Sequence, residues 1–589
     1  MGRRFLLACG TACCSLLFVA PAIAAAPGGT QQLRFAGTFA PGSVGTGTAS
    51  SGQVPPHEPN GKQLRHVQAA GVPSAVPTPL SGVQLAGFAG FNGLSHFDQA
   101  TAGTGTYAGT QFDLEPPDQG LCVGNGHVVE AVNNALRVFS TAGAAQTAPI
   151  ALNQFFGLAP EIQVGPPAVF GDFISDPKCY FDPDTGRFFL TELQISLNPA
   201  TGDFEAPSHL LLAVSQTGDP TLAWNIFELD TTNDGTNRTP ADPGCPCFGD
   251  QPLIGADANG FYITTNEYQL AGFAFNGARV YAFSKSGLEH GTNTNAVQFF
   301  AGPLTTSLPN GGLAVTIQPA TTPNGAYATA NNGTEYFMSP TDWGVGPALG
   351  TRANRLLVWA LTGTATLNRP TPSLSLTFVA IPSEVYAQPP NAAQRPGPRP
   401  LGDALHDPLE LLATNDDRLN QVVFAAGHLW SGINTAVNLP TGATLSGLAW
   451  FAVTPSDPAG TLSATVAKQG YVALDGENAM FPSIGVTGTG KAVMTFSVSS
   501  PDRFPSTAYA PLDLTSGAGA VRIAGAGSLP DDGFSGYKEF GGVGVGRWGD
   551  YSAAVADTIG RVWMAAEYIP GGPRTTFGNW GTFVFRVTP

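Results

Sequence analysis

Carboxylates recur at a fixed distance from turn glycines along this chain of 589 residues. An aspartate stands ten residues before a glycine, with an apolar stretch on each side, at Asp176 and Gly186, Asp250 and Gly260, Asp417 and Gly427, and Asp550 and Gly560. Met480 and Gly490 repeat the spacing without the acid. Such a repeat predicts a series of similar structural units, most of which carry a carboxylate at the same place.

Counting outward from the turn of each hairpin predicts which residue faces each acid. Asp250 is expected opposite Glu267, and Asp550 opposite Glu567. Directly opposed residues have Cβ atoms about 5 Å apart, and two charges at that distance repel by roughly 3 kcal/mol at an effective dielectric of about 20. Three arrangements relieve this repulsion: Ca²⁺ bridges the acids, one acid keeps its proton as a general acid does, or backbone amides and Arg547 satisfy both.

The other acids of the repeat are expected at the same mouth of the fold. The count places Asp176 opposite Leu193 and Asp417 opposite Asn434. The candidate acid–base residues are therefore Asp250, Glu267, Asp550 and Glu567, with Arg547 as their charge partner. The candidate ligand-binding residues are Asp118, Asp176 and Asp417, together with Trp548 and Tyr551, which flank Asp550.

The segments around these acids predict an all-β fold. They are short, rich in β-branched and aromatic residues, and bounded by turn residues. Seven units at intervals of about 70 residues predict a seven-bladed β-propeller, within a range of six to eight blades; a tandem of β-sandwiches is the alternative. The last unit shows only three strands, so a strand near residues 107–114 is expected to supply the fourth and close the ring.

The N-terminus has the features of an export signal. Arg3 and Arg4 precede an apolar stretch, and Ala22-Ile23-Ala24 is a cleavage motif, so residues 1–24 are predicted to be a signal peptide of a secreted or periplasmic protein. Residues 25–85 are rich in Gly, Pro, Ser and Thr and are expected to be a flexible linker. The propeller is expected over 86–589, with no later apolar stretch long enough to span a membrane.

The net charge limits the macromolecules that this protein is expected to bind, and the cysteine content bears on its disulfides. The formal net charge of -16 excludes nucleic acid and an anionic membrane surface as expected partners. Outside the signal the chain keeps Cys122, Cys179, Cys245 and Cys247. In an oxidising compartment these predict two disulfides in one of three pairings, and a zinc site is the rival interpretation.

Five stretches are similar to a family of large exported bacterial β-propellers without an established activity, and more loosely to sialidase-like propellers. They are residues 116–133, 175–193, 212–230, 492–500 and 547–568. The resemblance implies the fold rather than a reaction. The sialidase motif S-x-D-x-G-x-x-W is not met, because Asp557-Thr-Ile-Gly560 has one residue too many before the glycine.

The sequence thus predicts a monomeric exported β-propeller that binds a glycan or protein ligand at an acidic mouth. The alternative is a carbohydrate-active hydrolase or lyase that uses the same acids. No cofactor is certain, and Ca²⁺ is the candidate ion. The chain contains none of the motifs of serine hydrolases, zinc peptidases or nucleotide-binding proteins.

Overall fold

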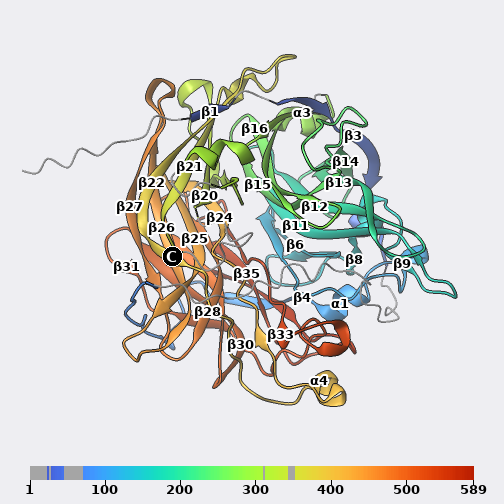
Figure 1. Cartoon of the computed structure of the whole chain (residues 1–589), viewed down its shortest axis with the longest axis vertical. Coiled ribbons are helices and arrows are strands. Elements are labelled where there is room, and N and C mark those ends of the chain that lie inside the picture. Colours follow the sequence, from blue (N-terminus) through green and yellow to red (C-terminus); the bar gives the residue numbers. More distant parts are fainter. Residues whose placement is uncertain (1–22, 26–27, 46–70, 293, 309–311, 342–351) are drawn as a thin grey trace, which may run out of the picture.

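The repeats form antiparallel sheets of four strands that are arranged around an axis (Figure 1). The computed structural model describes residues 23–25, 28–45, 71–292, 294–308, 312–341 and 352–589. Within these residues the strand pairing gives seven units, called blades 1 to 7 in the order of their innermost strands; each has four strands side by side, and in blade 6 the two short strands β31 and β32 both pair with β30 as its fourth strand. Those strands neighbour one another in sequence order, and the last neighbours the first. The predicted β-propeller is thereby confirmed.

The strands of each blade, from the innermost outward, have the following bounds. Blade 1 contains β5 (Gly120–Gly124), β6 (His127–Val132), β7 (Ala135–Ser140) and β8 (Ile150–Ala151); blade 2 contains β11 (Asp172–Asp182), β12 (Arg187–Leu197), β13 (Phe204–Ser215) and β14 (Trp224–Asp230); blade 3 contains β15 (Cys247–Ala256), β16 (Gly260–Gln269), β17 (Phe275–Ser284) and β18 (Asn295–Phe300). Blade 4 contains β19 (Gln318–Thr321), β20 (Thr334–Pro340), β21 (Arg352–Thr362) and β22 (Ser375–Ala387); blade 5 contains β24 (Leu419–Ala425), β25 (His428–Asn438), β26 (Thr444–Ser456) and β27 (Ser463–Val472). Blade 6 contains β28 (Asn478–Val486), β29 (Ala492–Ser500), β30 (Arg503–Asp513), β31 (Gly517–Ala518) and β32 (Arg522–Gly525); blade 7 contains β34 (Ala553–Ala556), β35 (Val562–Tyr568), β36 (Gly581–Val587) and β4 (Ala89–Ser95).

Short elements lie in the connections between strands. They are the helices α1 (His96–Ala100), α2 (Leu152–Phe156), α3 (Lys285–His290) and α4 (Pro400–Leu405), and the two-stranded sheets of β9 (Ile162–Gln163) with β10 (Val169–Phe170) and of β23 (Leu411–Leu412) with β33 (Val545–Gly546). In the part of the chain described, no helix has the length and apolar character to cross a membrane.

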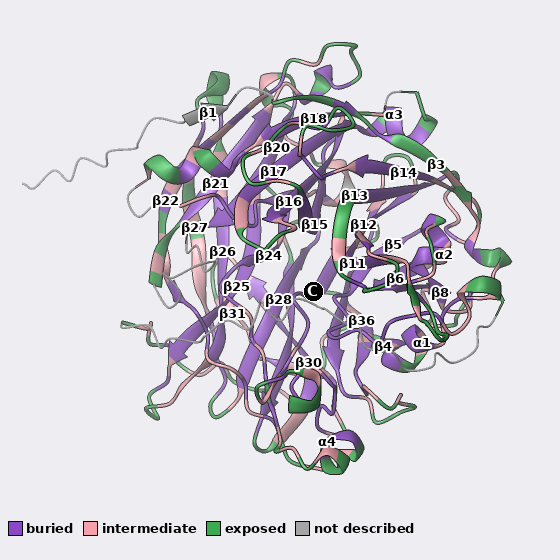
Figure 2. Ribbon diagram, turned by 45° about the vertical axis from the view of Figure 1, so that its right-hand side comes forward, coloured by how far each residue is buried: buried purple, intermediate pink, exposed green. Residues whose placement is uncertain are grey.

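Apolar runs rather than strict alternation mark the central strands, because each blade packs against a neighbour on both faces. The stretch Leu210–Val214 in β13 is buried throughout. One hydrophobic cluster lies at each of the seven contacts between consecutive blades, including the contact of blade 7 with blade 1. Figure 2 shows the buried strands inside and the exposed loops at the periphery.

Tryptophans occupy these contacts between blades. The buried members are Trp224, Trp359, Trp430, Trp450 and Trp563. Rings of Trp430 and Trp450 stack with their centroids 6.2 Å apart. Burial of one large apolar side chain stabilises a fold by about 1.5–3 kcal/mol, so the seven contacts hold the ring closed without a central core.

Strand β4 closes the ring. It pairs antiparallel with β36, so the first part of the chain completes the last blade as expected. The predicted position of this strand, residues 107–114, is wrong. Those residues carry a short 3-10 helix, Gly105–Tyr107, and then the approach to blade 1. The sequence signal failed because β4, AGFNGLS, holds two glycines and little apolar alternation.

Part of the predicted linker lies on the outer edges of the blades. Strand β3 (Arg34–Phe39) pairs with β14, and β2 (Gly29–Gln32) pairs with β18. Strand β1 (Ile23–Ala25), which begins within the predicted signal peptide, pairs with β22. Further along, Ser74 and Leu80 form isolated bridges to blades 5 and 6. Residues 46–70, and residues 1–22 of the predicted signal peptide, lie outside the described part of the chain.

Candidate functional site

Five of the innermost strands have a residue of unusual backbone conformation in their first half or just before their first residue. Positive φ angles occur at Asp118 (49°), Asp176 (63°), Gln251 (52°), Thr316 (46°) and Phe481 (59°). Non-glycine residues rarely adopt this region, because the Cβ atom approaches the backbone. The same strain at corresponding points of five blades marks one end of the propeller, called the mouth here, as a specialised place.

Bulges at the mouth shift the strand register. The ladder is interrupted between Ser175 and Lys178, and between Asp250 and Leu253. Two residues of the inner strand then oppose one residue of its partner. As a result Asp250 pairs with Asn266, and Gly249 pairs with Glu267. The predicted opposition of Asp250 and Glu267 is therefore wrong, because a count from the turn assumes an unbroken ladder.

The other predicted oppositions also change. Ser175, rather than Asp176, pairs with Leu193. Asp417 lies before the first paired residue of β24 and does not oppose Asn434. Asp550 lies before β34, whose first residue pairs with Ala565. Glu567 instead accepts a hydrogen bond from the backbone N–H of Gly549 at 2.7 Å.

Three aspartates from different blades do meet at the mouth. One carboxylate oxygen of Asp118 accepts a hydrogen bond from the backbone N–H of Asp550 at 2.7 Å, and the other accepts from the Asn133 amide at 3.0 Å. The Asn133 carbonyl oxygen accepts from the backbone N–H of Asp176 at 2.9 Å. Asp118, Asp176 and Asp550, called the aspartate triad below, thus join blades 1, 2 and 7.

The pKa values of ionisable groups at the triad are shifted from their usual range. Burial, the neighbouring Asp550 and then Asp176 hold the pKa of Asp118 well above its usual range. Burial lowers the pKa of Lys178 to about 7, although the carboxylates of the triad favour its charged form. The Lys178 ammonium lies over the ring of Tyr551. Burial and the neighbouring carboxylates therefore favour the protonated form of Asp118.

Arginines border the triad. Arg547 is partly exposed and is close enough to Asp118 to favour its ionised form. Arg418 is buried and donates hydrogen bonds to both oxygens of Asp416, each at 2.7 Å, and to the Gln251 side chain at 2.7 Å. It therefore links the start of blade 5 to blade 3. The Asn415 amide donates to Asp550 at 2.9 Å and orients that carboxylate.

A cavity of about 90 Å³ lies along the inner strands. Its wall includes Gln119, Lys178, Gln421 and Ser552, and it receives residues from all seven blades. A space of this size holds several water molecules. The wall combines these polar side chains with apolar ones such as Val423 and Val486.

Comparisons with known proteins do not assign a family. No family model matches the chain, and no curated protein matches it. Among solved structures it is similar to a GH43 β-1,3-galactosidase bound to galactodeoxynojirimycin, with 11% identity, a TM-score of 0.27, and 62% of this chain and 97% of that chain covered. A protein of unknown function from Dyadobacter fermentans has 12% identity and a TM-score of 0.28, with 73% of this chain and 100% of that chain covered. An endo-arabinase from Bacteroides thetaiotaomicron has 11% identity and a TM-score of 0.26, with 69% of this chain and 92% of that chain covered.

TM-scores this low do not establish a shared fold or activity. The propeller assignment rests on the strand pairing of this chain. The sialidase-like part of the resemblance receives no support from these three structures.

All five predicted ligand-binding residues are buried, with 1–5% of each residue exposed. Trp548 is 1% exposed and packs in an apolar cluster with Met480 and Phe481. Tyr551 is also 1% exposed, and its hydroxyl donates to the backbone oxygen of Pro177. Both side chains are therefore packed beneath the mouth and do not offer a surface to a ligand.

Asn133, Lys178 and Arg418 are the residues that sequence reasoning missed. Lys178 stands two positions after Asp176, and Arg418 directly follows Asp417, so each adjoins a predicted acid. Asn133 follows the second strand of blade 1 and has no sequence signal of its own.

A second buried acidic group lies outside the mouth. Glu410, Asp531 and Glu115 are each less than 5% exposed. Burial and the neighbouring Asp531 hold the pKa of Glu410 well above its usual range, and burial raises the pKa of Asp531 to about 7. The ionised form of Glu410 is therefore disfavoured in the folded protein.

The four cysteines form two disulfides. Cys122 of β5 is bonded to Cys179 of β11 and fastens blade 1 to blade 2, and Cys245 is bonded to Cys247. The prediction of two disulfides is confirmed, and the structure selects one of the three pairings. Loop-closure entropy assigns about 4 kcal/mol to the first bond and only about 1 kcal/mol to the second.

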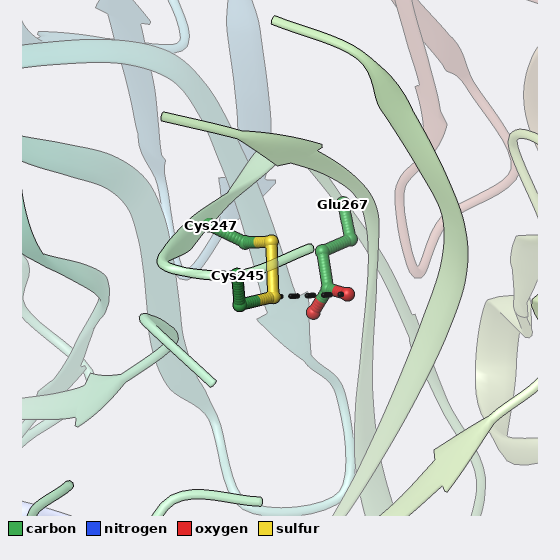
Figure 3. A group of neighbouring side chains, drawn as sticks. All are labelled: Cys245, Cys247 and Glu267. Carbon is green, nitrogen blue, oxygen red and sulfur yellow. Dashed lines mark hydrogen bonds between the residues drawn. A yellow bond between two sulfur atoms is a disulfide. The ribbon is translucent and has the colours of Figure 1, made fainter. Parts of the chain in front are cut away.

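Glu267, predicted at the mouth, lies instead beside the short disulfide (Figure 3). Among the described residues, Cys245, Cys247 and Glu267 are the one set of metal-ligand types whose donor atoms lie within 4.8 Å of one another. With both sulfurs in a disulfide, neither supplies the thiolate that a zinc ion requires.

Proposed function

We propose that this protein is an exported carbohydrate-active hydrolase in which the aspartate triad carries the acid–base chemistry. The observation that supports this proposal most is the raised pKa of Asp118, which lies beside two further carboxylates. Glycoside hydrolysis uses one protonated and one ionised carboxyl group on either side of the scissile bond. Asp118 would act as the acid, and Asp550 or Asp176 as its ionised partner.

The surroundings of the triad fit this division of roles. Asn415 holds Asp550 through a hydrogen bond to one oxygen, which leaves its second oxygen for a reacting group. Lys178 and Arg547 are both partly exposed next to the triad, so a polar ligand approaches the acids along these two side chains. Both side chains can place positive charge beside the carboxylates of the triad.

A second candidate function is the binding of a glycan or protein ligand without turnover. The observation that favours it is that both oxygens of Asp118 already accept hydrogen bonds within the protein. The acids of the triad are also only 1–7% exposed. In this case the triad fastens blades 1, 2 and 7, and Arg547 contacts the ligand.

Bridging of the acids by Ca²⁺ also stays a proposal. The melting temperature of the protein with and without EDTA tests it.

The two candidates separate in one set of measurements. The purified full chain is incubated with a panel of neutral and acidic polysaccharides, and release of reducing ends is measured beside binding on a glycan array. Hydrolysis predicts that Asp118→Asn and Asp550→Asn each lower turnover by roughly 10²-fold or more. Asp513→Asn, at an exposed position of blade 6, is the control and is expected to keep full turnover.

Asparagine keeps the shape of aspartate, and its side-chain oxygen still accepts a hydrogen bond, so folding is checked by the melting temperature of each variant. Full turnover in Asp118→Asn would refute the assignment of the acid. Binding without any turnover, unchanged in both variants, would support the second candidate in place of the first.

A further inference from the structure

A three-residue loop closed by a disulfide stands at the entry to blade 3. Cys245, Pro246 and Cys247 connect the end of blade 2 to β15. Cys245 is partly exposed, Pro246 is exposed and Cys247 is fully buried. The two sulfurs therefore differ in their access to solvent, and an incoming molecule meets Cys245 first.

Polar groups surround this disulfide. A carboxylate oxygen of Glu267 lies 3.7 Å from Cys245 Sγ (Figure 3). The Asn276 amide donates to that oxygen at 2.6 Å and lies 3.8 Å from Cys245 Sγ and 3.9 Å from Cys247 Sγ. Arg279 Nε is 3.5 Å from the other oxygen of Glu267. A structural disulfide is inert in an apolar setting, whereas this one has an N–H donor near both sulfurs and a carboxyl group near the sulfur of Cys245.

Stability does not account for the bond. It closes over residues only two positions apart and so removes little freedom from the unfolded chain. Cys247 is already held by the ladder to Gln269 and by a backbone hydrogen bond to Thr232 at 2.9 Å. The blade would keep its register without the disulfide.

We propose that Cys245–Cys247 is a redox-active disulfide that exchanges with external low-molecular-weight thiols, with Cys245 as the sulfur attacked. An incoming thiolate forms a bond to Cys245 Sγ while the bond between the two cysteines breaks. The electron pair leaves on Cys247 Sγ, next to the Asn276 amide. A carboxyl oxygen of Glu267 lies within 4.8 Å of Cys247 Sγ, and burial favours the protonated form of this group, so Glu267 supplies the proton that converts the thiolate to a thiol.

A second thiolate then attacks the external sulfur of the mixed disulfide. It releases the oxidised external disulfide and leaves Cys245 reduced, so two thiols are oxidised for each protein disulfide that is reduced. This activity does not depend on the aspartate triad or on the proposed hydrolysis.

The test uses the folded, oxidised full chain and reduced glutathione. Samples are quenched in acid, free thiols are alkylated, and each cysteine is quantified by peptide mass spectrometry. Cys245 and Cys247 are expected to become labelled at least roughly tenfold faster than Cys122 and Cys179, which serve as the control within the same molecule. Equal rates for both disulfides would overturn the proposal.

Single variants test which sulfur is attacked. With oxidised glutathione, Cys247→Ser is expected to take up one glutathione on Cys245, and Cys245→Ser is expected to take up none on the buried Cys247. Equal uptake by both variants would contradict the assignment. Glu267→Gln is expected to slow the reduction and to flatten its pH dependence, whereas Glu192→Gln, another buried glutamate on the neighbouring blade, is expected to leave the reduction rate unchanged.

Discussion

Removal of the two disulfides is expected to have very different effects on stability. The perturbation is a pair of double variants, Cys122→Ala with Cys179→Ala, and Cys245→Ala with Cys247→Ala. The first bond closes a loop with a sequence separation of 57, and the second a loop with a separation of 2. Because the entropy that a cross-link removes from the unfolded chain grows with the logarithm of loop length, the losses are about 4 kcal/mol and about 1 kcal/mol near room temperature.

The positions of the two disulfides in the fold also predict a larger loss of stability for the first pair than for the second. Cys122 and Cys179 belong to an apolar cluster between blades 1 and 2, so their loss also weakens that contact. Cys245 lies in an exposed loop whose strand is held by its own ladder. Alanine avoids the burial of a hydroxyl group at the two fully or nearly buried positions in the first pair.

Urea unfolding followed by tryptophan fluorescence measures both losses, because tryptophans are buried at contacts between the blades. The midpoint is expected to fall strongly for the first variant and slightly for the second, with similar dependence on urea. Equal losses would refute the loop-entropy argument. A larger loss for Cys245→Ala with Cys247→Ala would show that the short disulfide is a structural bond, and it would remove the reason to assign it another role.

Two further outcomes are expected. Since the folded state binds protons more tightly than the unfolded state at Asp531 and Glu410, stability is expected to fall as pH rises from about 4 through the folded pKa of Asp531, about 7. Urea midpoints at about pH 5 and about pH 8 measure this slope, and Glu410→Gln should flatten it; an unchanged slope in that variant would contradict a contribution of Glu410 to it. Deletion of residues 28–39, which removes β2 and β3, is expected to expose the outer edges of β18 and β14 and to promote association through them. Light scattering after size-exclusion chromatography detects this, and a deletion variant in the same state of association as the full chain would argue against edge protection.

Much of the fold follows from local patterns in the sequence. Apolar segments such as Leu210–Val214, bounded by turns and repeated along the chain, are sufficient to predict stacked four-stranded blades. The missing strand of the last blade was also predictable, because an unpaired edge must be covered. The position of that strand was not, since AGFNGLS resembles a loop and gains its strand conformation only by pairing with β36.

The acids also show what local sequence can predict and what depends on the tertiary structure. The spacing of Asp176, Asp250 and Asp550 from their glycines placed them at the starts of inner strands, because the turn and the strand length are local properties. Which acids meet was decided by the tertiary structure. Bulges after Ser175 and Asp250 moved each register by one residue, and a bulge depends on the pairing of two strands rather than on spacing in one.

The fate of Glu267 gives the clearest contrast. Its sequence position predicted a partner for Asp250 at the mouth, but the one-residue shift placed it opposite Gly249 and beside Cys245. In the same way, only the ring of blades brought Asp118 to the backbone of Asp550, 432 residues away. The sequence by itself determined the type of unit and the residues each unit offers. The tertiary structure decided their neighbours, because contacts between blades join residues that no local pattern connects.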